Sequence, residues 1–183
     1  MQQLTDEQLI KIFQRNEGNK GQVAFSHLYN RYSKLMLNYF YFSLHYDHNK
    51  AQDFVQDLFV KILEKHRTFN NDQFFKAWIY RIATNMCSNE YRKNNVIRKY
   101  HDHILSSTEI ITLNPETENI LRKCISDLNT EHRSLIVLRF KLKLTIKEIA
   151  EICECPEGTV KSRLFYTRKR LSERLEKYRN LSF

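Results

Sequence analysis

Hydrophobic residues recur along most of this chain at the spacing of an amphipathic α-helix. Phe25, Leu28 and Tyr32, for example, stand at positions i, i+3 and i+7 and share one helical face. Four segments of this kind precede residue 93, and polar stretches separate them. The pattern predicts helices at about residues 5–16, 22–44, 51–66 and 73–92.

The pattern fades in the middle of the chain and returns after it. Polar residues dominate from residue 94 to Pro115, which predicts an interdomain linker. Pro115 suits the first turn of a further helix, and four helices are expected after the linker. Only 3 Gly and 2 Pro occur in 183 residues, too few for the turns of a β-sheet. The predicted fold is all-α, with two helical domains (1–94 and 116–183) joined by a flexible linker (95–115).

The segment from residue 144 to residue 171 has the pattern of a helix-turn-helix. Thr145 and Glu148 have the spacing of a capping box at the start of a short helix. Pro156 and Gly158 interrupt the chain soon afterwards, and a second helix follows. That helix is expected to bury one face, made of Val160, Leu164, Thr167 and Leu171. Its other face is polar, aromatic and basic, with Ser162, Phe165, Tyr166 and Lys169.

The charge of the chain indicates a polyanionic partner, with nucleic acid favoured over a membrane surface. Lys and Arg total 30 against 21 Asp and Glu, which gives a formal net charge of +9. Much of the excess lies between residues 161 and 179. In a helix-turn-helix the second helix enters the major groove, where outward side chains meet base edges and flanking Lys and Arg contact phosphates. A merely solvated basic face is the alternative, and the capping box, the turn and the polar face together favour DNA binding.

The sequence offers little for catalysis, metal binding or membrane insertion. It contains no GxxxxGK[ST], GxSxG or HExxH motif, so we expect neither an enzyme nor a cofactor. Cys153 and Cys155 form a CxC pair, but no second pair completes a zinc site. We therefore expect no metal and a small buried thiol at Cys153. With no leader and no apolar run long enough to span a bilayer, we expect a cytoplasmic protein with reduced cysteines and no membrane insertion.

The motif and the segments around it resemble a known family. The segment TIKEIAEICECPEGTVKSRLFYTRKRL resembles region 4 of the sigma-70 family, in its extracytoplasmic-function (ECF) group, and CISDLNTEHRSLIVLRF resembles the helices before it. In the first half, FSHLYNRYSKLMLNYFYF, AQDFVQDLFVKILEKHRTF and FFKAWIYRIATNMCSNEYRK resemble region 2, in order and at the expected spacing. The resemblance implies a bacterial sigma factor that binds core RNA polymerase and directs it to the −10 and −35 elements of promoter DNA. It also implies an anti-sigma factor as a further partner.

The resemblance assigns roles to individual positions. It implies that the helix at 51–66 binds the coiled coil of the polymerase's largest subunit through Asp53, Gln56, Asp57 and Phe59, and that the polymerase flap is a further contact. It implies that the −10 element meets the loop from Arg67 to Phe75 and the next helix, through Phe69, Tyr80, Arg81, Asn85, Asn89 and Arg92. It implies that the −35 element is read by Thr159, Lys161, Ser162, Arg163, Phe165 and Arg168.

Some of these positions have a second interpretation. Phe69 suits a cap over the core as well as a base-capturing aromatic, and Trp78 is expected in the core because it shares the apolar stripe of its helix. Asp53 and Asp57 lie one turn apart and repel each other unless a cation such as Lys61 or a partner protein is near.

A stand-alone helix-turn-helix regulator, which binds duplex operator DNA without polymerase, is the alternative function. A repressor needs a ligand pocket or a dimer interface in its first half, whereas this chain has side chains suited to single-strand contact there. A sigma factor gains promoter specificity only after core polymerase is added. One position departs from the common motif: Glu154 occupies a turn position where many helix-turn-helix motifs carry Gly, and we expect slight strain there.

Overall fold

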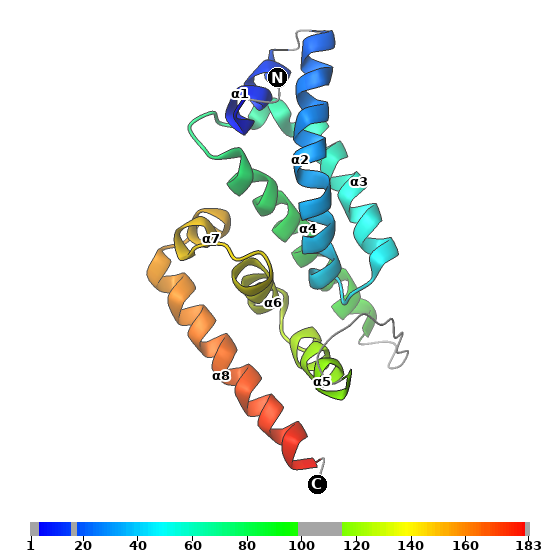
Figure 1. Cartoon of the computed structure of the whole chain (residues 1–183), viewed down its shortest axis with the longest axis vertical. Coiled ribbons are helices and arrows are strands. Elements are labelled where there is room, and N and C mark those ends of the chain that lie inside the picture. Colours follow the sequence, from blue (N-terminus) through cyan, green and yellow to red (C-terminus); the bar gives the residue numbers. More distant parts are fainter. Residues whose placement is uncertain (1–3, 16–17, 99–114, 182–183) are drawn as a thin grey trace. The chain divides into compact units, whose positions relative to one another are not determined.

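A computed structural model describes residues 4–15, 18–98 and 115–181, and these residues form helices and no strand (Figure 1). The all-α prediction is therefore confirmed. The chain divides into two compact units: Met1–Cys87 with Glu151–Cys153, and Ser88–Ala150 with Glu154–Phe183. Most of the predicted linker falls on residues 99–114, which lie outside the described residues. Within the described ranges, no helix has an apolar stretch long enough to cross a membrane.

The first unit contains three whole helices and the first part of a fourth. They are α1 (Asp6–Gln14), α2 (Asn19–Ser43), α3 (His48–Lys65) and α4 (Phe75–Arg98), whose residues from Ser88 onward fall in the second unit, with a 3₁₀ turn at His66–Thr68. Local side chains cap α1 and α3. Thr5 caps α1 in a capping box, because its hydroxyl accepts the Gln8 N–H while the Gln8 side chain accepts the Thr5 N–H. The side chain of Asp47 caps α3 by accepting the N–H of Lys50 at 3.0 Å.

Three helix boundaries differ from the prediction by three residues or more, and one of them is the start of α3, at His48 instead of about residue 51. α2 begins at Asn19, inside the stretch expected to be a polar break, and Gly18 before it has a φ of 52°. Glycine reaches this left-handed region without a Cβ penalty. α4 continues to Arg98, past the predicted domain boundary at residue 94.

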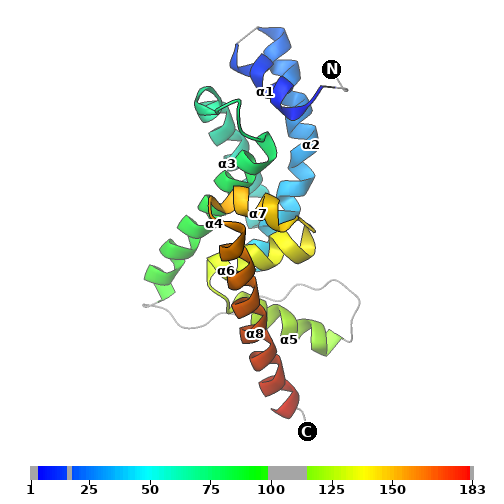
Figure 2. The same ribbon diagram turned by 90° about the vertical axis from the view of Figure 1, so that its left-hand side faces the viewer.

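Aromatic rings form much of the core of the first unit. α1 and α3 both pack against α2, and α2 and α3 lie side by side (Figure 1, Figure 2). Tyr39 of α2 meets Tyr80 of α4 edge-on at 5.7 Å, and Tyr32 meets Phe75 at 5.3 Å. Trp78 is buried, as predicted. Each buried ring of this kind contributes about 1.5–3 kcal/mol through removal of apolar surface from water.

The second unit carries the helix-turn-helix on a small helical support. Its helices are α5 (Pro115–Ser126), α6 (Thr130–Ile136), α7 (Ile146–Cys153) and α8 (Glu157–Leu181). α5 and α6 both pack against α8, around a core of Cys124, Ile125, Leu128, Ile136 and Leu171. Pro115 opens α5, as predicted. The helix expected at residues 131–140 changes to a π-helical turn at Val137–Lys141, a difference that periodicity does not reveal.

Candidate nucleic-acid interface

The turn between α7 and α8 follows from three local features. The Thr145 and Glu148 capping box fixes the start of α7: the Thr145 hydroxyl accepts the Glu148 N–H at 3.2 Å, and the Glu148 side chain accepts the Thr145 N–H at 2.8 Å. Glu154 ends α7 in the left-handed conformation, at φ 50° and ψ 44°. The Pro156 carbonyl then accepts the Val160 N–H and starts α8. The expected strain at Glu154 is therefore located in its backbone, because a residue with a Cβ is disfavoured in this conformation.

α8 has the two faces that its sequence predicts. Val160, Leu164, Thr167 and Leu171 are buried, while Lys161, Ser162, Phe165 and Arg168 are exposed. The rings of Phe165 and Tyr166 are 63% and 64% exposed, with centroids 5.5 Å apart. Tyr166 was not among the residues assigned a role, although its outward direction was predicted. Two adjacent aromatic rings left in water are a typical sign of a binding surface.

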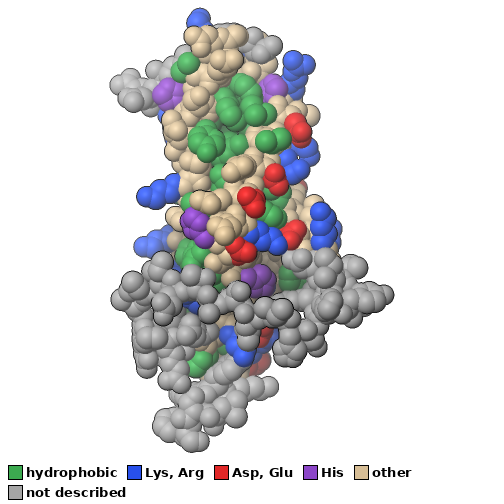
Figure 3. Space-filling view, turned by 90° about the vertical axis from the view of Figure 1, so that its right-hand side faces the viewer, with side chains coloured by type: hydrophobic (Ala, Val, Ile, Leu, Met, Phe, Trp, Pro, Cys, Tyr) green, Lys and Arg blue, Asp and Glu red, His purple; other side chains and the backbone are tan. Residues whose placement is uncertain are grey.

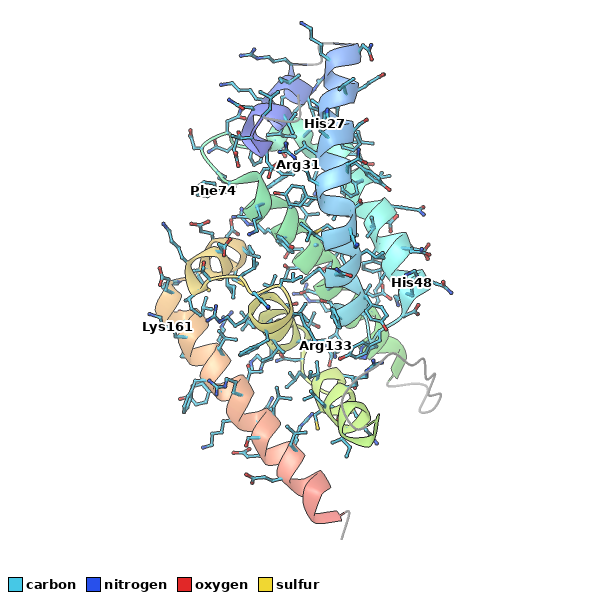
Figure 4. All side chains as sticks on the ribbon, in the orientation of Figure 1. His27, Arg31, His48, Phe74, Arg133 and Lys161 are labelled. Atoms are coloured by element: carbon cyan, nitrogen blue, oxygen red, sulfur yellow. The ribbon has the colours of Figure 1, made fainter. Side chains whose placement is uncertain are left out.

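The charges on this face differ in how far they are already neutralised. Arg163 is half-buried and lies 3.9 Å from the carboxylate of Glu131 on α6. Lys161, on the outer side of α8 (Figure 4), and Arg168 form no ion pair with any described carboxylate. These two cations are available to phosphates without first losing a protein partner.

Thr159 has a mainly local role in the first turn of α8. It is half-buried, its N–H donates to the Pro156 carbonyl at 2.9 Å, and its own carbonyl accepts the Ser162 hydroxyl at 3.0 Å. Both groups are close to the helix N-terminus, where backbone N–H groups favour a nearby anion such as a phosphate.

A histidine beneath the basic face reports its electrostatic environment. Burial lowers the pKa of His132 on α6 below its ordinary value, and the nearby positive charge of Arg170 lowers that pKa further. Both effects favour the neutral form of the ring beside the arginines of α8.

The loop before α4 points one aromatic inward and another outward. Phe69 is 3% exposed and packs on Trp78 at 5.1 Å and Phe75 at 5.9 Å, so in this conformation it caps the core. Phe74 is 62% exposed and projects from the start of α4 (Figure 4). Phe74 was not among the residues predicted to contact DNA. The sequence did contain an indication of its exposure: Phe75 fits the apolar face of α4, whereas Phe74 lies off that face.

α4 brings four of its predicted residues onto one side. Arg81, Asn85, Asn89 and Arg92 follow one another at helical spacing; Arg81 is half-buried and the other three are exposed. Tyr80 is only 2% exposed and packs edge-on against Tyr39, so its ring is not on the surface in this conformation.

α3 presents acidic and apolar side chains side by side. Asp53, Gln56 and Asp57 are exposed, and neither aspartate pairs with a cation among the described residues. Phe59 is instead buried, 4.6 Å from the ring of Tyr29. Val60 lies one turn beyond Asp57 and is exposed, as is Leu63, and neither was among the residues predicted to bind polymerase. Figure 3 shows hydrophobic side chains on this face of the molecule, with acidic and basic side chains among them.

The cysteines do not add a site. Cys87 and Cys124 are buried, and burial raises the pKa of the Cys124 thiol. Cys153 is only partly buried, which differs from the buried thiol that was expected. In the part of the chain that the structure describes, no three His, Cys, Asp or Glu side chains lie together as a metal site would require.

Comparison with known proteins identifies the two units. The family model for Sigma-70 region 2 matches residues 28–96, and the model for Sigma-70, region 4 matches residues 118–171. The ECF RNA polymerase sigma-E factor of Haemophilus influenzae is 28% identical, over 96% of this chain and 97% of its own length. The RNA polymerase sigma-H factor of Pseudomonas aeruginosa is 29% identical, over 93% and 94% respectively.

A solved structure agrees with these relatives. The sigma factor RpoE of Bartonella quintana, determined in complex with the anti-sigma factor NepR, is 28% identical to this chain, with a TM-score of 0.63. The similarity covers 83% of this chain and 96% of that one. Region 2 thus falls on α2 to α4, and region 4 falls on α5 to α8, in the order that the sequence predicted. The chain belongs to the sigma-70 family and is an extracytoplasmic-function sigma factor.

Proposed function

We propose that this sigma factor binds core RNA polymerase and directs it to promoters by contacting the −10 element with its region 2 helices and the −35 element with its region 4 helices. One observation carries the proposal: a region 2 unit and a region 4 unit occur in one chain, each with an exposed polar surface on its recognition helix. Two such surfaces suit two separated DNA elements.

For the −35 element, we assign base readout and phosphate contact to different residues of α8. Ser162 and Phe165 face outward near the start of the helix, where a major-groove helix meets base edges. Phe165, together with Tyr166, suits apolar contact with thymine methyl groups. Lys161, Arg163 and Arg168 flank them and suit phosphates, with Thr159 near the same end.

For the −10 element, we assign the melted strand to α4 and the loop before it. Arg81, Asn85, Asn89 and Arg92 offer hydrogen bonds and charge along one side of α4. Phe74 offers the exposed ring on which an unpaired base stacks. Phe69 and Tyr80 support this surface from the core.

For core polymerase, we assign the exposed face of α3. Asp53, Gln56 and Asp57 provide acceptors for basic side chains of the largest-subunit coiled coil, and Val60 provides apolar area among them. Phe59 supports this face from below. The second unit contacts the flap. We extend the proposal to an anti-sigma factor, because the Bartonella relative was solved with one.

A stand-alone regulator is the alternative, and it predicts a different dependence on polymerase. The test is run-off transcription with purified core polymerase on a library of genomic promoter fragments. We expect specific transcripts only when both proteins are present, and weak DNA binding by the sigma factor alone. Tight, specific duplex binding without core and no transcript with it would favour the alternative.

Two variants separate the roles within this assay. Asp57→Arg should weaken core binding by about tenfold or more, because it opposes a basic partner. Phe165→Ala should leave core binding unchanged and reduce the preference for the cognate −35 element by about fivefold or more. Equal loss of core binding in both variants would contradict the assignment.

A further inference from the structure

The loop between α3 and α4 is tied to α1 by a single amide side chain. Gln14 is the last residue of α1, and its Nε2 donates to the carbonyl oxygens of His66 at 2.8 Å and Phe69 at 2.9 Å. Its Oε1 accepts a hydrogen bond from Nδ2 of Asn71 at 3.0 Å. Both donors and the acceptor of this side chain are therefore engaged by three residues of one loop.

A second tie lies where the loop joins α4. The carboxylate of Glu7 accepts the backbone N–H of Phe75, the first residue of α4, at 3.2 Å. The first N–H groups of a helix lack partners within it, and a negative charge there is favoured by the helix dipole. The ring of Phe13 also lies 4.5 Å from the ring of His66. α1 thus contacts the loop at both of its ends and in its middle.

α1 is itself fixed to the body of the first unit. The Asp6 carboxylate accepts hydrogen bonds from Arg31, at 2.7 Å, and from the Tyr32 hydroxyl, both on α2 (Figure 4 labels Arg31). Leu9 and Ile10 of α1 are fully buried. A rigid helix therefore holds the loop, and the loop directs Phe69 into the core while Phe74 stays exposed.

We propose that α1 positions the −10 loop: Gln14 and Glu7 hold residues 66–75 in the conformation that receives an unpaired base, which stacks on Phe74. The inference rests on the function proposed above. Glu7 and Gln14 are positioning residues, and they precede the segment matched by the region 2 family model, which begins at residue 28. A loop ordered in advance does not have to lose conformational freedom when the base arrives, so the hydrogen bonds from α1 add to affinity without touching DNA.

The test measures capture of one base by holoenzyme. Fluorescent single-stranded oligonucleotides carry the non-template −10 sequence of a promoter found by run-off transcription, either intact or with one nucleotide at a time made abasic. In wild-type holoenzyme we expect one abasic position to cost about tenfold or more in affinity, the value of a stacked base. The ratio of the affinity for the intact oligonucleotide to the affinity for that abasic one should fall to about twofold in Phe74→Ala.

Gln14→Met is the decisive variant, because it keeps the length of the side chain and removes all three hydrogen bonds. We expect the intact-to-abasic ratio to fall to about threefold or less, while core affinity is unchanged. Gln22→Met is the matched control, since Gln22 is exposed on α2. Glu7→Gln keeps an acceptor for the Phe75 N–H and should give a smaller loss than Gln14→Met.

The possible outcomes separate this inference from the proposed function. If wild-type holoenzyme shows no sensitive position, capture by the loop is wrong. If wild type shows one and Gln14→Met keeps the same ratio, the positioning role is wrong even when overall affinity falls, because a merely structural defect lowers binding of both oligonucleotides equally. A reduced ratio with normal core affinity supports positioning.

Discussion

The buried side chain of Arg133, on α6, links this helix to the end of α5 in the second unit. It is 2% exposed, its Nε donates to the carbonyl of Ile125 at 3.3 Å, and its Nη2 donates to the carbonyls of Leu128, at 2.9 Å, and Ser126. α5 ends at Ser126, so these carbonyls lie at a helix C-terminus, where partners are missing and a cation is favoured. The burial of this charge is thus offset by hydrogen bonds to the end of α5.

Arg133→Met should therefore lower the free energy of unfolding of the second unit by about 2–4 kcal/mol, because buried carbonyls lose a charged donor. Arg133→Lys should fall between Met and wild type, since an ammonium group lacks the planar fork that reaches several carbonyls. Urea unfolding followed by circular dichroism measures both. A loss below about 0.5 kcal/mol for the Met variant would show that the hydrogen bonds contribute little.

Tyr32 makes the first unit sensitive to alkaline pH. Burial, then its hydrogen bond to Asp6, raises the pKa of the Tyr32 hydroxyl above the ordinary value of 10.0. Below pH 10 the hydroxyl is protonated in both the folded and the unfolded chain, and its contribution is fully present. Above pH 10 the unfolded chain loses this proton and the folded chain keeps it, so stability falls as pH rises.

Tyr32→Phe should remove that part of the pH dependence. At pH 8 we expect the variant to be less stable by about 1 kcal/mol, because Asp6 loses a hydrogen bond. Between pH 10 and 11 the difference in free energy of unfolding between wild type and variant should narrow by about 1 kcal/mol, since only the wild-type chain must keep the buried phenol protonated. Urea titrations of both proteins at pH 10 and pH 11 provide the measurement. A difference in stability that stays constant would show that Tyr32 does not cause the alkaline sensitivity.

The helices show which features a sequence predicts and which require the fold. The capping box at Thr145 and the two faces of α8 were predicted, because each depends on the spacing of residues within one helix. The π-helical turn after Ile136 was not predicted. There the backbone fits a core in which Val137 and Leu138 are both buried, a tertiary demand that helical periodicity does not encode.

The candidate sites also contain some features that the sequence predicts and others that depend on the fold. Helical spacing alone placed Arg81, Asn85, Asn89 and Arg92 on one side of α4. Loop residues were less predictable: whether Phe69 or Phe74 faces outward depends on hydrogen bonds from α1, which is distant in sequence. The burial of Phe59 likewise depends on rings of α2. Family resemblance assigned positions, but only the packing shows which side chains reach the surface.

Glu154 offers a test of strain at the level of the helix-turn-helix. Because its backbone is left-handed, Glu154→Gly should stabilise the second unit by about 0.5–1 kcal/mol, after allowance for the greater freedom of glycine in the unfolded chain. Glu154→Val should destabilise it, since a β-branched residue fits this conformation worst. Urea unfolding of the two variants checks the sign, and a stable Val variant would show that the turn relaxes instead.

At the scale of the whole molecule, DNA binding depends on how an excess of nine positive charges is distributed. Part of the basic surface is already engaged within the protein, as at Arg163 with Glu131 and Arg174 with Asp127. Lys161 and Arg168 are exposed and stand outside these pairs. Association with phosphates releases counterions in proportion to the cations that make contact. Exposed cations on α8 should thus dominate the salt dependence of −35 binding.

Arg168→Ala tests this directly. In holoenzyme binding to duplex DNA with the −35 element, the slope of log K against log salt should become shallower by about 0.9, the value for one lost phosphate contact. Lys34→Ala is the matched control: it removes one exposed positive charge from α2, outside the proposed DNA surfaces, and should leave the slope unchanged. Core affinity should be the same for both variants. If both changed the slope equally, net charge and not the α8 face would determine binding; if neither did, Arg168 would not contact phosphate.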